Sequence, residues 1–195
     1  LKVIPKEFKN LVTLSCSSNQ IKVIPDELNK LVKLWCSGNQ ITSLPISLDN
    51  LKELHCSGNR LDSLPELMGC LVHLWCHDNT INYLPNGLVR LEELNCSNNR
   101  LTVLPGGLSS IVTLYCNHNR LNSLPMDLGD TLKYLYCSNN RLVCIPKELK
   151  SLEILFATYN YLSSIPDEII NNLKEYGLFW CHQNIQEDLN DEDWK

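Results

Sequence analysis

The prolines of this chain recur at a constant interval along the whole sequence. All nine are spaced by twenty or twenty-one residues, at Pro5, Pro25, Pro45, Pro65, Pro85, Pro105, Pro125, Pro146 and Pro166. Eight of the ten cysteines follow nearly the same spacing, at Cys16, Cys36, Cys56, Cys76, Cys96, Cys116, Cys137 and Cys181. Such regularity indicates one small supersecondary unit copied along the chain, which cannot bury its apolar side alone. We therefore expect the copies to stack on one another.

Each copy has the pattern L-x-x-L-x-C-x-x-N-x-L-x-x-L-P-x-x-L-x-x, as in Leu51, Leu54, Cys56, Asn59 and Leu61. This pattern resembles the leucine-rich repeat family, with cysteine where leucine is usual, and the resemblance covers essentially the whole chain. The twenty-residue length is most similar to the short repeats of bacterial effectors, internalin-type proteins and giant amoebal viruses. The resemblance implies an α/β solenoid, an arc with a parallel β-sheet on its concave side and short extended or 3-10 segments on its convex side.

The individual positions of the repeat have physical roles. Alternation along a short strand points the leucine and the cysteine to one face and the residue between them to the other. The asparagine that follows can satisfy backbone groups of its own loop and of the next coil. We expect a repeat domain over residues 1–185, with a helix near 166–176 before the last strand, capped by Ser164. An acidic tail is expected over 186–195.

The charge distribution argues against two classes of function. The chain has 22 acidic and 17 basic residues, but five of the acids lie in the last ten residues, and residues 1–185 are almost neutral. A nearly neutral body does not favour non-specific binding to a nucleic-acid backbone. No apolar run is long enough to cross a membrane, so no membrane function is expected.

The cysteines are expected to be reduced thiols that act as small core side chains. On parallel strands their spacing is about 4.8 Å, wider than the separation of roughly 3.8 Å between the Cβ atoms of a disulfide. This usage favours a reducing compartment, the cytoplasm, or a host cytoplasm if the protein is delivered there. No C-x-x-C pair is present, and three histidines that point outward, His55, His73 and His77, are expected to hold no functional metal. No cofactor is expected.

The outward-facing residue of each strand is the strongest functional signal. Aromatic side chains recur at this position, and we call them the aromatic column: Trp35, His55, Trp75, Tyr115, Tyr136, Phe156 and Trp180. Exposed aromatic side chains in a line are typical of surfaces that bind a partner. The alternative is that the rings only stack on each other and stiffen the sheet.

A second column follows the asparagines. Four of the five arginines lie there, and we call them the arginine column: Arg60, Arg100, Arg120 and Arg141. Arginine beside aromatic rings suits an acidic partner. Alternatively, these arginines only provide a hydrated edge of the sheet and form ion pairs with Glu53, Glu92, Glu93 or Glu153. The sequence leaves both interpretations open.

No phosphate-binding, hydrolase or metalloprotease motif occurs, so we do not expect an enzyme. The sequence predicts a module that binds a partner protein or an extended peptide on its concave face. One alternative follows from the resemblance: because some relatives carry a ubiquitin-ligase domain after such repeats, the chain would be the substrate-recognition part of a larger effector or ubiquitin-ligase-like protein. Another alternative is a platform for nucleic acid, which the charge distribution disfavours.

Overall fold

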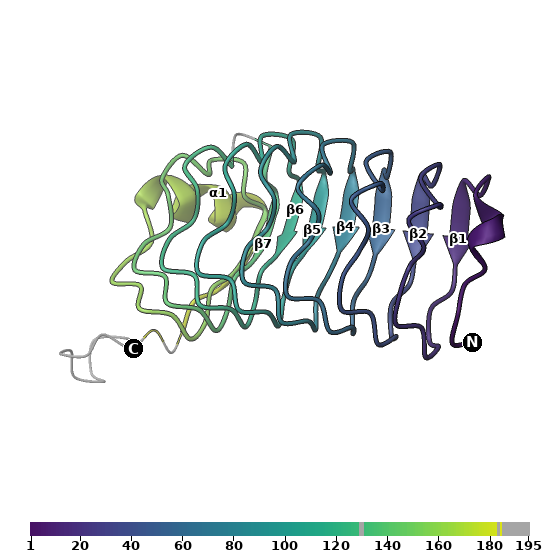
Figure 1. Ribbon diagram of the computed structural model, residues 1–195. Helices are drawn as coiled ribbons and strands as arrows, with labels where there is room; N and C mark the ends of the chain where they lie inside the picture. Colours follow the sequence, from purple (N-terminus) through teal and green to yellow (C-terminus); the bar gives the residue numbers. More distant parts are fainter. Residues whose placement is uncertain (129–130, 183, 185–195) are drawn as a thin grey trace.

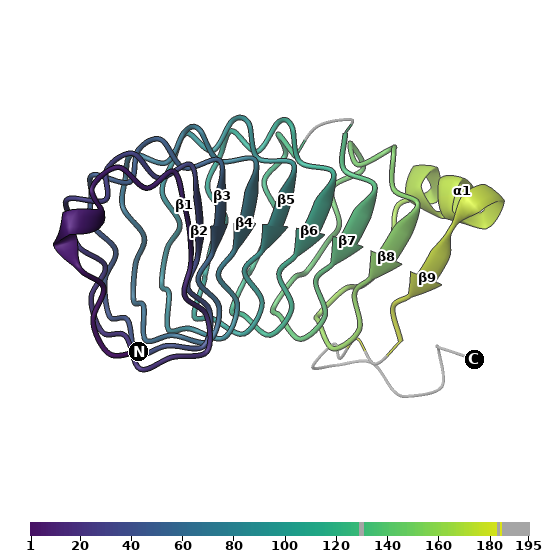
Figure 2. The same cartoon turned by 90° about the vertical axis from the view of Figure 1, so that its right-hand side faces the viewer.

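The computed structural model describes residues 1–128, 131–182 and 184, and of residues 174–176 it describes the main chain alone. The chain forms a solenoid whose strands build one parallel sheet in sequence order (Figure 1). Figure 2 shows these strands side by side along the molecule. The nine strands are β1 (Thr13–Ser15), β2 (Lys33–Trp35), β3 (Glu53–His55), β4 (His73–Trp75), β5 (Glu93–Asn95), β6 (Thr113–Tyr115), β7 (Tyr134–Tyr136), β8 (Ile154–Phe156) and β9 (Leu178–Trp180). The predicted solenoid with a parallel sheet is confirmed.

The pairing register repeats the sequence period. Thr13 of β1 lies opposite Lys33 of β2, and Tyr115 of β6 lies opposite Tyr136 of β7, so equivalent repeat positions always become neighbours. The return path on the other side of the solenoid consists largely of turns that begin at the prolines. A 3-10 helix, η1 (Lys6–Phe8), lies in the first coil. Because every coil has the same path, one position of the repeat becomes one row of side chains on the surface.

Helix α1 (Asp167–Tyr176) lies at the β9 end of the solenoid (Figure 2). It begins after Pro166, and no side chain caps its first turn, so the predicted role of Ser164 as the cap is wrong. Pro166 occupies the N-cap position in place of Ser164, and proline has no side-chain oxygen that could accept from the first turn. No helix in the described part of the chain is long and apolar enough to span a membrane. The predicted acidic tail, 186–195, lies outside the described residues.

The core is a stack of equivalent layers. In β3, Leu54 is fully buried, as is Cys56 directly after the strand, whereas His55 between them is partly exposed, as the alternation predicts. Seven cysteines, which we call the cysteine ladder, are buried in successive layers: Cys16, Cys36, Cys56, Cys76, Cys96, Cys116 and Cys137. All ten cysteines are free thiols. Burial raises the pKa of Cys16 to about 11 and the pKa values of Cys76 and Cys137 to about 12.

The asparagines hold neighbouring coils together. The Asn140 side chain donates to the carbonyl of Cys137 in its own coil at 3.1 Å and to the carbonyl of Cys116 in the preceding coil at 2.9 Å. Its Oδ1 accepts the backbone N–H of Leu121, also in the preceding coil. The predicted role in backbone satisfaction is confirmed, but the second coil is the preceding one and not the next one. The amide of one side chain thus satisfies three backbone groups that the turn would otherwise leave without a hydrogen-bond partner.

The residue before each of these asparagines has a positive φ, which the repeat pattern did not reveal. The values lie between 51° and 67° at Ser18, Gly38, Gly58, Asp78, Asn98, His118, Asn139 and Tyr159. This left-handed conformation turns the chain sharply away from the strand and directs the asparagine side chain into the core. Residues as different as glycine, histidine and tyrosine occur here, so the turn is imposed by the stacked coils rather than by local preference.

Replacing Gly177 with alanine is expected to loosen the last coil. A Cβ atom at Gly177 would lie 2.5 Å from the carbonyl oxygen of Glu153 and 2.8 Å from Leu173 Cδ2, so α1 and β9 would have to shift. We expect the free energy of local unfolding of this coil to fall by about 1–3 kcal/mol. Faster hydrogen exchange of the Leu178 amide, which donates to Glu153, would measure this loss.

Gly106→Ala is the matched control for this experiment. A Cβ atom there would meet only Asp127 Oδ2 at 3.5 Å, which is an ordinary contact. Exchange that is equally slow in the Gly177→Ala variant and in the parent would contradict the close approach of α1 to the eighth coil.

Candidate recognition surface

The third residue of every strand except β1 and β5 belongs to the aromatic column on the outward face of the sheet. Its rings follow one another from strand to strand, because each strand lies in register with the next. The last strand resolves which aromatic residue belongs to the column: Trp180 lies opposite Phe156, whereas Phe179 lies opposite the buried Leu155. The sequence-based assignment of Trp180 to the column is therefore correct.

The aromatic column consists of two stacked groups. In the first, His55 is stacked on Trp75, with a centroid distance of 4.6 Å and nearly parallel planes, and Trp35 is tilted against His55 at 6.1 Å. In the second group, Tyr115, Tyr136, Phe156 and Trp180 follow one another at centroid distances of 4.5, 5.2 and 5.9 Å. Asn95 of β5 separates the two groups.

The rings of the second group present mainly their edges to solvent. Their planes are inclined to each other by only 14°, 16° and 23°, so the face of one ring covers the face of the next. Ring edges carry the positive end of the aromatic quadrupole. They therefore suit carbonyl and carboxylate oxygens or the face of another ring, and offer little surface on which a nucleobase can stack.

A row of charged residues lies beside the first aromatic group and was not identified from the sequence. Lys33, Glu53, His73 and Glu93 are the first residues of successive strands, and Trp35 Nε1 donates to Glu53 Oε1 at 2.7 Å. Trp75 Nε1 donates in the same way to Glu93 Oε1 at 3.0 Å. The sequence does contain this pattern, because titratable residues recur at the first position of the four successive strands β2 to β5.

Electrostatic contacts hold Lys33 and Glu53, the first two residues of this charged row, in place. Lys33 Nζ lies 2.8 Å from Glu53 Oε2, and this hydrogen bond is the main cause of the lowered pKa of the Glu53 carboxyl. Burial lowers the pKa of His55, whose Nε2 lies 3.4 Å from Glu53 Oε1. At neutral pH the ring that stacks on Trp75 is therefore mainly the uncharged imidazole.

The outward-facing histidines do not converge on one point. His73 is the first residue of β4, whereas His77 lies beyond the end of this strand, so the two histidines do not share one strand. His77 Nδ1 contacts Asp78 at 2.7 Å, and His73 Nδ1 lies 3.8 Å from Glu93. Among the residues that the structure describes, no group of three or more histidine, cysteine, aspartate or glutamate side chains is arranged to hold a metal ion.

The arginine column is exposed and lies apart from the rings. Each arginine follows the asparagine turn, five residues after the third residue of the preceding strand. In the described part of the chain, no cation–π contact and no ion pair involves Arg60, Arg100, Arg120 or Arg141. Of the carboxylates considered as their partners, Glu53 and Glu153 are paired with lysines instead, at 2.8 and 2.7 Å. These guanidinium groups face solvent.

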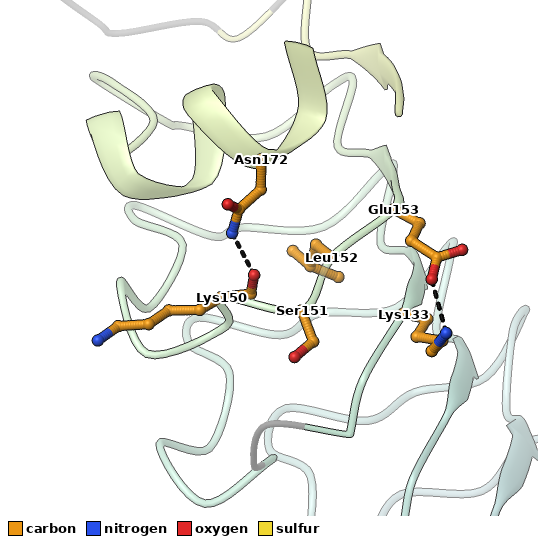
Figure 3. A pocket seen from close by; sticks show the side chains of 6 residues that line it. All are labelled: Lys133, Lys150, Ser151, Leu152, Glu153 and Asn172. Atoms are coloured by element: carbon orange, nitrogen blue, oxygen red, sulfur yellow. Dashed lines mark hydrogen bonds and ion pairs between the residues drawn. The ribbon is translucent and has the colours of Figure 1, made fainter. Parts of the chain in front are cut away.

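A hollow of about 630 Å³ lies between α1 and the coils that contain β7 and β8 (Figure 3). Lys133, Lys150, Ser151, Leu152, Glu153 and Asn172 line it. As Figure 3 shows, Asn172 donates to the carbonyl of Lys150, and Glu153 is paired with Lys133. The six lining residues include no nucleophile with a base beside it and no pair of carboxylates, so this hollow offers no catalytic arrangement.

Family models and solved structures both assign this chain to one family. Models described as Leucine Rich repeats match residues 9–47 and 29–67, and a Leucine Rich Repeat model matches residues 90–111 and 131–152, together more than half of the chain. A search of curated proteins finds no significant match. Several solved structures are similar.

YopM from Yersinia enterocolitica is 30% identical, with a TM-score of 0.75 over 82% of this chain and 36% of its own. The functional domain of InlJ from Listeria monocytogenes, which includes a cysteine ladder, is 28% identical, with a TM-score of 0.81 over 88% of this chain and 40% of its own. A chain in an octameric complex of Latrophilin 3, Unc5D and the leucine-rich repeats of FLRT2 is 27% identical, with a TM-score of 0.68 over 85% of this chain and 59% of its own.

This chain thus spans less than half the length of the YopM and InlJ chains that it matches. The buried cysteines of this chain agree with the cysteine ladder that the InlJ domain includes. The protein belongs to the leucine-rich repeat family.

Proposed function

We propose that this protein is a recognition module without catalytic activity that binds a partner protein on the exposed face of its sheet. Leucine-rich repeat proteins are typically binding scaffolds, and the solved complex with Latrophilin 3, Unc5D and FLRT2 contains such repeats. The observation that carries the proposal is the aromatic column, whose Trp75 and Trp180 are 37% and 49% exposed on a rigid sheet. Large aromatic side chains held in one geometry lose little entropy when a partner covers them.

The dimensions of the surface support a macromolecular partner. Nine strands at about 4.8 Å span roughly 38 Å, which is the length of an extended peptide segment or of one side of a small domain. The edges of the second aromatic group and the solvent-facing arginine column both favour electron-rich groups. They support a partner with acidic residues near the ends of β6 and β7.

The ring geometry disfavours the nucleic-acid alternative. Binding of single strands relies on bases that stack on ring faces. The faces that these four rings, Tyr115 to Trp180, turn to one another are covered by the neighbouring ring, and residues 1–185 carry almost no net charge. The free, buried thiols support a reducing compartment such as the cytoplasm as the place where the partner is met.

Removing two rings of the second aromatic group is expected to abolish partner binding. The partner is first isolated by crosslinking to the parent protein in the source cells, and its affinity is then measured by biolayer interferometry. The double variant Tyr136→Ala and Phe156→Ala is expected to weaken binding at least about 100-fold, because central aromatic anchors contribute about 2–4 kcal/mol each.

The matched control is the double variant Ile46→Ala and Met126→Ala, which removes two apolar side chains, each about three-quarters exposed, from the turns after the prolines. We expect it to bind like the parent. Equal affinity of the Tyr136 and Phe156 variant and the parent would refute the assignment of the binding surface to the sheet.

A further inference from the structure

The aromatic column is interrupted once, and the interruption has a defined shape. Asn95 of β5 occupies the position that holds Trp75 in β4 and Tyr115 in β6. Its Oδ1 accepts the backbone N–H of Ser97 at 3.2 Å, so the short side chain bends toward its own chain. It therefore does not stand between the flanking rings as an aromatic side chain would. We call this gap the Asn95 slot.

The two rings beside the Asn95 slot turn their faces to it. Trp75 has one face covered by His55 at 4.6 Å, and its other face looks toward β5. Tyr115 is covered by Tyr136 at 4.5 Å on the side away from β5. The slot is thus the place in the column where two ring faces oppose each other without a ring between them. Two strand spacings separate them by roughly 9.6 Å, so a cation placed midway would lie about 5 Å from each ring, within the range of roughly 6 Å for a cation–π contact.

A carboxylate at the edge of the slot gives it a negative charge. Glu93 lies two residues before Asn95 on the same face of β5, and its Oε1 accepts from Trp75 Nε1 at 3.0 Å. Its charge also contributes to the raised pKa of Tyr115, after burial and the neighbouring Tyr136, which agrees with a position between the two rings.

Glu93 differs from the other two carboxylates along the sheet in its ionic partner. Glu53 and Glu153 are neutralised by lysines, at 2.8 and 2.7 Å. Among the described ion pairs, Glu93 has only His73, at 3.8 Å. No lysine or arginine of the described chain neutralises Glu93, so its charge is available to a cation from outside.

We infer that the Asn95 slot binds an arginine side chain of the partner protein, with the guanidinium plane between the rings of Trp75 and Tyr115 and its charge toward Glu93. The inference rests on the proposed function and adds a chemical feature of the partner. A guanidinium group is flat, keeps its charge at any physiological pH and stacks on aromatic faces. An ammonium group matches the charge but not the flat space, and a neutral ring matches the space but not the charge.

The test is an NMR titration of the 15N-labelled protein with N-acetylarginine methylamide. The readout is the indole N–H signal of Trp75, assigned with a Trp75→Phe variant. We expect a saturable shift with a Kd in the millimolar range, as is usual for a single side chain. The citrulline analogue, which has the same shape without the charge, is expected to cause at most a tenth of the shift at equal concentration, and the lysine analogue is expected to bind at least threefold more weakly.

Two variants and one control complete the experiment. Asn95→Tyr fills the slot and is expected to abolish the shift, and Glu93→Gln keeps an acceptor for Trp75 but is expected to weaken binding at least fivefold. Glu92→Gln removes the neighbouring exposed carboxylate and is expected to leave binding unchanged. No saturable shift with the arginine compound, equal shifts with citrulline, or unchanged binding in the Glu93 and Asn95 variants would overturn the inference.

The outcome is separable from that of the proposed function. If the Tyr136 and Phe156 variant loses the partner while the arginine compound does not bind, the sheet is the binding surface and the slot assignment alone is wrong. If the compound binds the slot but the same variant retains the partner, the slot assignment stands and the broader assignment of the binding surface is wrong.

Discussion

Raising the pH from 8 to 11 is expected to unfold this protein in a steep transition, because its core contains six thiols with no exposed surface. Cys36, Cys56, Cys76, Cys96, Cys116 and Cys137 are all fully buried. Burial raises their pKa values from the ordinary 9.0, to about 12 at Cys76 and Cys137. In the unfolded chain the same thiols ionise near pH 9. Their contribution to stability is complete below pH 9 and is lost as the pH rises toward their folded values.

The size of the expected effect follows from proton linkage. Above pH 9 the unfolded state binds one proton fewer per thiol, so each buried thiol lowers the free energy of unfolding by about 1.4 kcal/mol per pH unit. Six thiols together lower it by about 8 kcal/mol per unit, which is comparable to the whole stability of a typical domain, about 5–15 kcal/mol. Urea titrations at pH 8, 9 and 10, followed by far-UV circular dichroism, measure this slope.

A variant with Cys96→Ala and Cys116→Ala isolates the contribution of the thiols. The lysines and tyrosines that also titrate at high pH are unchanged in it, so any difference in slope belongs to the two cysteines. We expect its stability to fall by about 3 kcal/mol less per pH unit than that of the parent, although the smaller side chains lower its stability at pH 8. Parallel pH profiles for the two proteins would contradict the role of buried thiols.

Replacing Asn140 with alanine is expected to destabilise the protein by about 3–5 kcal/mol. The side chain is 7% exposed and holds the carbonyls of Cys116 and Cys137 and the N–H of Leu121. Alanine leaves these buried backbone groups without a partner, and each such group costs about 1–3 kcal/mol where water cannot reach it. Equilibrium urea unfolding at pH 7 measures the difference.

Asn122→Ala is the matched control, since this asparagine is exposed on the far side of the turn. We expect its stability to stay within about 0.5 kcal/mol of the parent, as for ordinary surface substitutions. If Asn122→Ala and Asn140→Ala destabilise the protein equally, the asparagines do not act through hydrogen bonds between coils.

Much of the fold could be predicted because the repeat turns a local pattern into a global one. Leu54, His55 and Cys56 define inside and outside for one strand, and the constant period then sets the same register for the others. The residues around Pro166 also indicated the helix that is found at Asp167–Tyr176. By contrast, the positive φ at Tyr159 has no local signature, because tyrosine seldom adopts it and the stacked turns impose it.

The sequence by itself determined which residues share a row: the buried thiols, the asparagines, the aromatic column and the arginine column each follow from the period alone. Only the tertiary structure decided how these rows meet. It pairs the carboxylates with lysine, histidine and indole groups rather than with the arginines, and it opens the slot at Asn95. The physical reason is that the repeat period determines which residues are neighbours along the solenoid. Contacts between different rows depend on side-chain rotamers, and these are selected only when the strands lie side by side.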